Sequence, residues 1–461
     1  MRRGLVAGCA LALLSGCTSG DGTTTASTPP STAFSLLPAT SASSGPVRVP
    51  ADWPTYHGTP DRSGVARTMP AVSGTPKVVA SVRLDGAVYA SPVIVGGTVV
   101  VATERNVVYA LDLTGRTKWQ RRLGTPADRG ELPCGNIDPL GITGTPIVQD
   151  GTVYLSPELG SPPRHDLVAL DLRTGAVTWR RSIDLPGVDT AAMQERGALT
   201  IAGGRVWVPF GGLAGDCGGY KGRVVGVRLD GTGAPIAYTV PTTREAGIWT
   251  PPGPSVDRAG NLFVQVGNGE SGPGDPYDHS DSVLKVGTKG QLLDSFSPTR
   301  WASDNAGDLD LGSQGPALVG TRWVFAAGKS GIAYVLDQHR LGGIGGEVGR
   351  TGLCRSYGGT AVDGSVVYVP CDDGLRAVRI DAAGRMHQLW LARPAGSPVV
   401  GGGRVWTLDT GAGTLLALDP ATGEPKEQVH VGDASRFATP ALYGRYVLVG
   451  TLDGLAVVRT S

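Results

Sequence analysis

The feature that most constrains this chain is a strand pattern that recurs eight times. Each copy has a glycine, one or two polar residues and a run rich in Val, Tyr or Trp, as in 151–155. The copies begin at Gly97, Gly151, Gly204, Gly260, Gly320, Gly364, Gly403 and Gly444. Successive glycines are therefore 54, 53, 56, 60, 44, 39 and 41 residues apart, about the length of a four-stranded blade with variable loops. The spacing predicts an all-β fold, an eight-bladed β-propeller of four-stranded antiparallel blades.

Further strands accompany each copy at matching offsets. A strand opening with proline or a small residue precedes it, as in 91–95, and a strand ending in an Asp and Gly turn follows, as in 110–115. The fourth strand often opens with a tryptophan, as at Trp119 and Trp179. The 71 glycines, 34 prolines and only 18% charged residues suit many short strands joined by tight turns. A meander repeated around an axis closes its own ring and leaves no long exposed sheet edge.

The eighth repeat lacks a fourth strand of its own. The chain ends directly after the third strand of that repeat, 454–459, whereas an unassigned strand pattern, 77–84, precedes the first complete repeat. We predict that this N-terminal strand pairs with the last blade and closes the ring. Deleting residues 75–85 is then expected to destabilise the fold far more than deleting the segment before it.

The first 50 residues predict export and a lipid anchor. Met1-Arg2-Arg3 precedes a short apolar stretch, 4–14, and small residues lead up to Cys17. We interpret 1–16 as a lipoprotein signal peptide and Cys17 as the lipidated residue; the alternative is an ordinary signal peptide cut nearby. Residues 17–50, rich in Ser, Thr and Pro, predict a disordered tether, because they have few residues to bury. The propeller then occupies 51–461, lipid-anchored at the extracytoplasmic face of the cell membrane.

Charge and cysteine content narrow the partners further. A formal net charge of +1 gives no electrostatic basis for nucleic-acid binding, and we expect a monomer with a protein or envelope partner.

Four cysteines follow Cys17, and an even number in an oxidising compartment favours disulfides, with three possible connectivities. We favour Cys134 with Cys217 and Cys354 with Cys371, the second because it closes a short loop within one repeat.

The third and fourth strands carry a motif that resembles a known family. Residues 169–179, Ala-Leu-Asp-Leu-Arg-Thr-Gly-Ala-Val-Thr-Trp, resemble the tryptophan-docking motif of quinoprotein alcohol dehydrogenase-like propellers. The motif is also found in non-catalytic lipoproteins similar to the outer-membrane assembly factor. The segment 53–58, Trp-Pro-Thr-Tyr-His-Gly, looks like the opening of PQQ-binding-like repeat lipoproteins of high-GC Gram-positive bacteria. The resemblance covers about 52–461 and implies the propeller fold.

The same resemblance implies a set of site residues in the fourth and fifth repeats. Gly267-Asn268-Gly269 resembles the segment of PQQ-dependent alcohol dehydrogenases whose asparagine helps to hold Ca²⁺. Asp308 and Asp310 look like the paired aspartates, one of which binds the metal and abstracts a proton. Lys329 is similar to the lysine that contacts the quinone. Carboxylate and amide oxygens suit a hard cation, and a lysine ammonium polarises a quinone carbonyl. Trp249 is a candidate floor for a flat ligand, or a tryptophan packed against the two prolines that follow it.

Two departures from the dehydrogenases point the other way. The chain has no adjacent cysteine pair to clamp a quinone and no Cys-x-x-Cys-His haem attachment. The alternative is that Asn268, Asp308, Asp310 and Lys329 serve blade geometry alone.

A wider acidic set is either a calcium site or a group of solvated loops: Asp275, Asp278, His279, Asp281, Asp304, Asp308 and Asp310. The leading hypothesis is a non-catalytic binding or scaffold lipoprotein. The second hypothesis is a dehydrogenase that uses PQQ and Ca²⁺ to oxidise alcohols or sugars.

Overall fold

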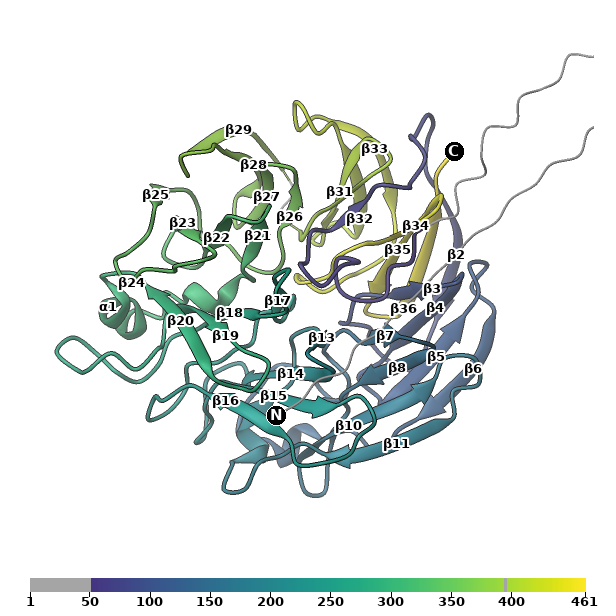
Figure 1. Cartoon of the computed structure of the whole chain (residues 1–461). Helices are drawn as coiled ribbons and strands as arrows, with labels where there is room; N and C mark the ends of the chain where they lie inside the picture. Colours follow the sequence, from purple (N-terminus) through teal and green to yellow (C-terminus); the bar gives the residue numbers. More distant parts are fainter. Residues whose placement is uncertain (1–50, 394–395) are drawn as a thin grey trace, which may run out of the picture. The chain divides into compact units, whose positions relative to one another are not determined.

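A computed structural model describes residues 51–393 and 396–461, which form eight antiparallel blades in a ring (Figure 1). The predicted all-β, eight-bladed β-propeller is confirmed. The expected signal peptide, 1–16, and the expected tether, 17–50, with Cys17, lie outside the described residues. One short α-helix, α1 (Trp301–Ala306), occurs in the described part, which contains no helix long and apolar enough to cross a membrane.

Within a blade the strands pair in chain order from the axis outwards. Blade 1 contains β3 (Val93–Val95), β4 (Thr98–Ala102), β5 (Val107–Leu111) and β6 (Thr117–Arg122). Blade 2 contains β7 (Ile147–Gln149), β8 (Thr152–Leu155), β10 (Arg164–Asp171) and β11 (Val177–Ser182). Blade 3 contains β13 (Thr200–Ala202), β14 (Arg205–Gly212), β15 (Arg223–Arg228) and β16 (Ile236–Thr239). Blade 4 contains β17 (Ser255–Val256), β18 (Leu262–Val266), β19 (Ser282–Val286) and β20 (Leu292–Ser297).

The second half of the ring repeats this order. Blade 5 contains β21 (Ala317–Val319), β22 (Trp323–Ala327), β23 (Ile332–Asp337) and β25 (Gly349–Gly352). Blade 6 contains β26 (Ala361–Asp363), β27 (Val366–Cys371), β28 (Gly374–Ile380) and β29 (Met386–Ala392). Blade 7 contains β30 (Val399–Gly401), β31 (Arg404–Asp409), β32 (Thr414–Leu418) and β33 (Pro425–His430). Blade 8 contains β34 (Ala441–Tyr443), β35 (Tyr446–Thr451), β36 (Gly454–Arg459) and, from the N-terminal side, β2 (Lys77–Arg83).

Short elements decorate the blades. They are β1 (Val65–Ala66), β9 (Glu158–Leu159), β12 (Met193–Gln194), β24 (Gly343–Ile344) and the 3₁₀ turns η1 (Arg129–Glu131), η2 (Thr190–Ala192) and η3 (Leu311–Ser313). The middle strands are buried on both faces, as all five residues of β5 and of β18 are, because each blade packs against two neighbours. Outer strands such as β6 are mostly exposed. The apolar core is therefore a series of layers between adjacent blades, such as that joining blades 1 and 2.

The predicted closure of the ring is confirmed. β2 pairs antiparallel with β36, with Lys77 opposite Arg459 and Arg83 opposite Gly454. The outermost strand of blade 8 thus comes from the start of the propeller and its three inner strands from the end. Because this pairing joins the two ends of the propeller, it holds the ring shut through backbone hydrogen bonds.

Three tryptophans dock onto the next blade as the motif predicts. The indole Nε1 donates to a carbonyl of the following blade, Trp119 to Leu172 (2.9 Å) and Trp179 to Leu229 (3.1 Å). Trp390 of blade 6 does the same to Pro420 (2.9 Å). The indole rings lie on turn glycines, Gly175, Gly231 and Gly423, where a Cβ atom would come within 2.7 Å of the ring. These turns also have positive φ, so glycine is required there for two reasons.

The segment 53–66, here called the axial segment, runs into the centre of the ring (Figure 1, purple). Its carbonyls accept hydrogen bonds from innermost strands of several blades, Pro54 from Val148 (2.8 Å), Pro60 from Val256 (2.9 Å) and Gly64 from Val400 (2.7 Å). Trp53 pairs with Ile94 of blade 1, and β1 runs parallel to β30 of blade 7. The axis of the propeller is therefore filled by the chain itself, which the sequence did not predict.

Both favoured disulfides are present. Cys134, between β6 and β7, is bonded to Cys217, between β14 and β15, so this bond links the blade 1 to blade 2 connection with a loop of blade 3. Cys354 follows β25 and is bonded to Cys371 at the end of β27. The pairing is confirmed, but its expected reason is wrong: the short loop crosses from blade 5 into blade 6 instead of lying within one repeat.

Candidate functional site

The site residues implied by the resemblance lie on four separate loops. Trp249 lies in the connection from blade 3 to blade 4, and Asn268 follows β18. Asp308 and Asp310 lie in the connection from blade 4 to blade 5, and Lys329 follows β22. The loops after second strands and the connections between blades meet at one end of the ring, here called the loop face. The contacts below show which of these side chains come together.

Lys329 lies between the two aspartates. Its Nζ is 2.6 Å from Asp308 Oδ1 and 2.6 Å from Asp310 Oδ2, and its backbone N–H donates to the Asp310 carbonyl (2.8 Å). Asp310 is buried and Asp308 is exposed. Burial raises the pKa of Asp310, although Lys329 opposes the shift. Burial acts to lower the pKa of Lys329, but the two carboxylates outweigh it and the pKa is raised. The ammonium is therefore held charged, with its charge already compensated.

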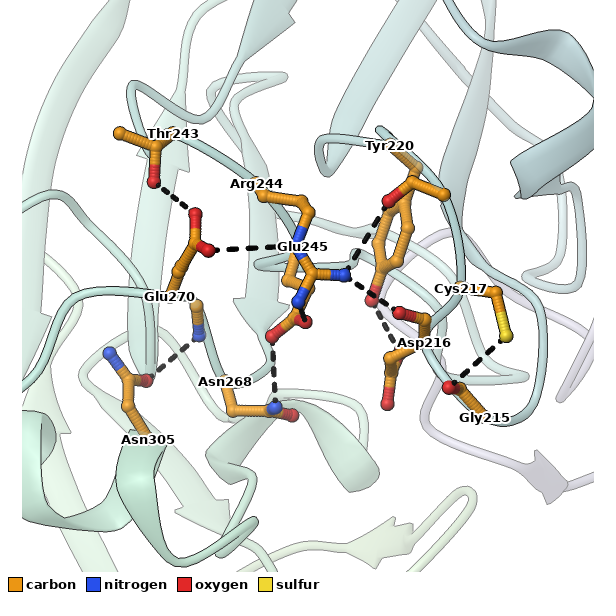
Figure 2. Close-up of polar contacts among 12 residues, drawn as sticks. Gly215, Asp216, Cys217, Tyr220, Thr243, Arg244, Glu245, Asn268, Glu270 and Asn305 are labelled. Atoms are coloured by element: carbon orange, nitrogen blue, oxygen red, sulfur yellow. Dashed lines mark hydrogen bonds and ion pairs between the residues drawn. The ribbon is translucent and has the colours of Figure 1, made fainter.

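Asn268 joins this group through both its backbone and its side chain. The Asn268 N–H donates to Asp310 Oδ1 (2.5 Å), and its amide lies between Asp310 and Glu245. In the orientation drawn in Figure 2 the amide nitrogen points to Glu245 Oε2 (3.5 Å); turning the amide by half a rotation points it to Asp310 instead. We call Asn268, Asp308, Asp310 and Lys329 the acid–lysine group.

A polar network continues from this group towards the first disulfide (Figure 2). Glu245 forms an ion pair with Arg244 (2.5 Å), whose Nη1 donates to the Asp216 carbonyl next to Cys217 (2.9 Å). The Tyr220 hydroxyl donates to the Asp216 carboxylate (2.5 Å). Burial raises the pKa of Glu245, and Arg244 opposes that shift. Sequence reasoning missed Arg244 and Glu245, because adjacent charged residues in a connection carry no distinctive pattern.

The wider acidic set, predicted to be either a calcium site or a group of solvated loops, divides into separate local contacts. Asp304 pairs with Arg300 (2.6 Å), Asp278 accepts from Ser280 and Ser271, and the Asp275 carboxylate accepts from Gly272. Asp281 accepts from the Leu311 N–H (2.8 Å) and has one buried oxygen without a partner; burial, with Asp310 adding to it, raises its pKa. Across 51–393 and 396–461, no three His, Cys, Asp or Glu side chains are arranged to hold a metal ion.

Trp249 contacts neighbours on two other loops. The Arg196 guanidinium lies 5.7 Å from the centre of its ring, and Phe437 packs edge-on at 6.1 Å. The ring is half-buried. Arg196 therefore lies over the Trp249 ring, on a face where a flat ligand could stack.

These observations show whether the residues of the site suit a calcium ion and a quinone. The oxygens of Asn268, Glu245 and Asp310 suit a hard cation. The quinone does not fit the side chains as they stand, since Arg196 and Phe437 contact Trp249 and the sequence lacks an adjacent cysteine pair. The oxygen types therefore suit a cation, but Lys329 and Arg244 already pair with the two carboxylates, and the quinone does not fit.

A second charged cluster, which sequence reasoning missed, is buried between blades 1, 2 and 3. His165 contacts Asp184 through Nδ1 (2.8 Å) and Glu158 through Nε2 (3.4 Å). Glu104 accepts from the Gly141 N–H (2.8 Å), and both carboxylate oxygens of Glu195 are buried without a hydrogen-bond partner. Burial raises the pKa of Glu104 to about 7. Burial acts to lower the pKa of His165, but Glu158 and Asp184 raise it to about 10. These residues are scattered in sequence and share no period, so no motif indicated them.

Comparison with known proteins supports the propeller assignment. The family model described as outer membrane protein assembly factor BamB matches residues 64–244. Quinohemoprotein alcohol dehydrogenase from Comamonas testosteroni has a TM-score of 0.70 and 17% identity, covering 89% of this chain and 80% of that one. BamB from Moraxella catarrhalis has a TM-score of 0.58 and 17% identity, covering 84% of this chain and 100% of that one. At such identities these likenesses show the fold alone.

One curated relative is similar over a shorter stretch. The 1-butanol dehydrogenase (cytochrome c) of Thauera butanivorans is 29% identical over 134 residues, which is 29% of this chain and 18% of that protein. The chain thus spans less than a fifth of the length of this relative. The expected resemblance to PQQ-binding-like propellers is confirmed at the level of the fold and the repeat.

Proposed function

The body of this chain is a PQQ-binding-like β-propeller, and from that premise we propose that it is a non-catalytic binding protein that uses its loop face. The observation that carries this proposal is the pairing inside the acid–lysine group. Lys329 compensates Asp308 and Asp310 at 2.6 Å each, and Asn268 donates to Asp310. A general base needs a carboxylate free to take a proton from a substrate, whereas these carboxylates are held by the protein's own donors.

We propose that the protein acts outside the cytoplasm, held at the cell membrane by a lipid on Cys17 and presented on the tether 17–50. The support is the signal-like sequence before Cys17 and the two disulfides of the propeller, which are typical of an oxidising compartment. The proposed partner is a protein or another envelope component. The proposed unit is a monomer, because β2 of the same chain completes the last blade and no second copy is needed to close the ring.

The second candidate is a dehydrogenase that uses PQQ and Ca²⁺ to oxidise alcohols or sugars. One observation favours it: Asn268, Asp310 and Lys329, distant in sequence, contact one another as the resemblance implies. In this role Asn268 and Asp310 would hold the metal, Asp310 or Asp308 would accept a proton, and Lys329 would donate to the quinone. When bound, the quinone would supply the two-electron acceptor.

One experiment separates the two candidates. The purified full chain is incubated with PQQ and Ca²⁺, desalted, and assayed for retained quinone absorbance and for dye reduction with alcohols and sugars. The binding role predicts no turnover. Turnover that Asp310→Asn abolishes and Asp61→Asn, on the axial segment, preserves would establish the dehydrogenase. Quinone retained without turnover would indicate a cofactor-binding sensor and leave the non-catalytic role standing.

A further inference from the structure

A second region of the loop face is a cavity of about 300 Å³ between blades 8, 1, 2, 3 and the end of blade 7. It is lined by residues of several connections, among them Tyr89, Thr143, Arg196, Pro251, Arg436 and Phe437. We call it the arginine pocket. Its volume is at the lower end of the range for small-molecule sites, and its lining mixes apolar side chains with a few polar groups, as such sites do.

Two guanidiniums face this cavity without an acidic partner. Within the described residues, neither Arg196 nor Arg436 forms an ion pair, whereas Arg404 pairs with Glu427 and Lys285 with Asp257. Arg196 Nη2 donates to Gln194 (2.7 Å), but its Nε is buried with no acceptor. Glu104 is the acidic group with the largest influence on Arg196, but no carboxylate of the described residues contacts either guanidinium directly. Two neighbouring cations without a carboxylate in contact favour the binding of an anion between them.

Aromatic rings hold the two guanidiniums in defined orientations on the cavity wall. Arg196 lies on the Trp249 ring, and Arg436 lies 4.5 Å from the Tyr357 ring centre and 5.0 Å from that of Phe437. Stacking on aromatic rings fixes the planar guanidiniums and leaves their N–H groups available. The buried Thr143 hydroxyl, on the cavity wall, lies beside the Glu104 carboxyl and acts to lower its pKa. The apolar wall is formed by Ile137, Pro251, Ala434, Phe437 and Leu452.

We propose that the arginine pocket binds a small organic anion, with its acidic groups between Arg196 and Arg436 and its apolar body against Phe437. This inference rests on the proposed binding function and names the ligand class. The pocket is separate from the acid–lysine group, whose charges are compensated. Charge selects the anion, and the cavity of about 300 Å³ limits its size.

The test uses isophthalate, a flat dicarboxylate, and isophthalamide, its neutral counterpart, with the full chain in isothermal titration calorimetry. We expect isophthalate to bind at least tenfold more tightly than isophthalamide, and added salt to weaken it. Arg196→Gln and Arg436→Gln should each weaken isophthalate at least tenfold and leave isophthalamide unchanged. The control, Arg258→Gln on the exposed turn after β17, should leave both unchanged. Arg436 is exposed, so its variant tests the pocket even if the Arg196 variant folds poorly.

Three outcomes would overturn the inference: equal binding of the two compounds, equal weakening by Arg258→Gln, or inorganic phosphate binding as tightly as isophthalate, which would leave no role for the apolar wall. PQQ is added in a separate arm. Turnover with PQQ would refute the proposed function, whereas failure of isophthalate to bind would refute only the ligand class, so the two failures are distinguishable.

Discussion

The acid–lysine group and the arginine pocket lie on the same face of the ring but treat charge in opposite ways. In the first, Lys329 is within 2.6 Å of two carboxylates, and its partner Asp310 is buried. In the second, Arg196 and Arg436 line one cavity and form no ion pair in the described part of the chain. A charged group that is paired within the protein is not available to a ligand, whereas a guanidinium without an ion pair can bind an anion.

This difference in ion pairing shows that residues can match a known family in position without being available for its chemistry. The acid–lysine group matches the resemblance residue by residue, yet its charges are used within the protein. The arginine pocket matches no motif, yet it offers the chemistry of a binding site. Substitutions in the acid–lysine group should therefore change mainly the stability of the fold, and substitutions in the arginine pocket should change mainly ligand binding.

Opening the ring should have the largest effect, because both regions are formed by loops of several blades. Deleting 75–85 removes β2 and leaves β36 with an unpaired edge. We expect loss of the single cooperative thermal transition, measured by circular dichroism, and loss of isophthalate binding. The control deletes 18–50 and should leave the melting temperature unchanged. An unchanged transition in the first variant would show that β2 does not hold the ring closed.

Removing the cation of the acid–lysine group should have the next largest effect. Lys329→Met leaves Asp310 buried without its partner, which costs about 3–5 kcal/mol of unfolding free energy in comparable buried pairs. Adding Asp310→Asn should recover most of this loss, because the uncompensated charge is then gone. Lys426→Met, whose ion pairs are exposed, should cost less than about 1 kcal/mol. Urea denaturation measures all three, and a loss for Lys329→Met as small as for Lys426→Met would contradict the contrast.

Glu104 gives a pH-dependent test near the arginine pocket. Its pKa rises from 4.5 to about 7 on folding, so the folded state binds more protons than the unfolded state between these values. Stability is therefore lost as pH rises from about 4.5 to about 7, by at most about 3 kcal/mol. Glu104→Gln should gain on the wild type across this window, with melting temperatures converging at pH 4 and diverging at pH 8. Asp433→Asn, which changes an exposed carboxyl outside the cluster, is the control variant.

The sequence predicted the structural features that follow a repeated pattern, and it did not predict the contacts between residues that share no pattern. The glycine period predicted the blades, and the missing fourth strand predicted that 77–84 closes the ring, because both follow from a regular pattern. The resemblance predicted that Asn268, Asp310 and Lys329 belong together. The axial segment was missed because its contacts are backbone hydrogen bonds to many blades, which leave no residue pattern. Arg196 and Arg436, 240 residues apart in irregular connections, meet only because the ring closes.

The smallest predicted change in stability is that of Arg196→Gln. This variant tests directly whether the guanidinium of Arg196 contributes to folding. The variant loses one hydrogen bond to Gln194 and the contact with Trp249, worth about 1 kcal/mol each, but it also removes a cation that burial disfavours. We expect a net change in unfolding free energy within about 1 kcal/mol. Arg404→Gln, which breaks a two-bond pair with Glu427, should cost about 1.5–3 kcal/mol. If Arg196→Gln costs as much as Arg404→Gln, then Arg196 is a structural cation like Lys329, and the two regions of the loop face do not differ in the way they treat charge.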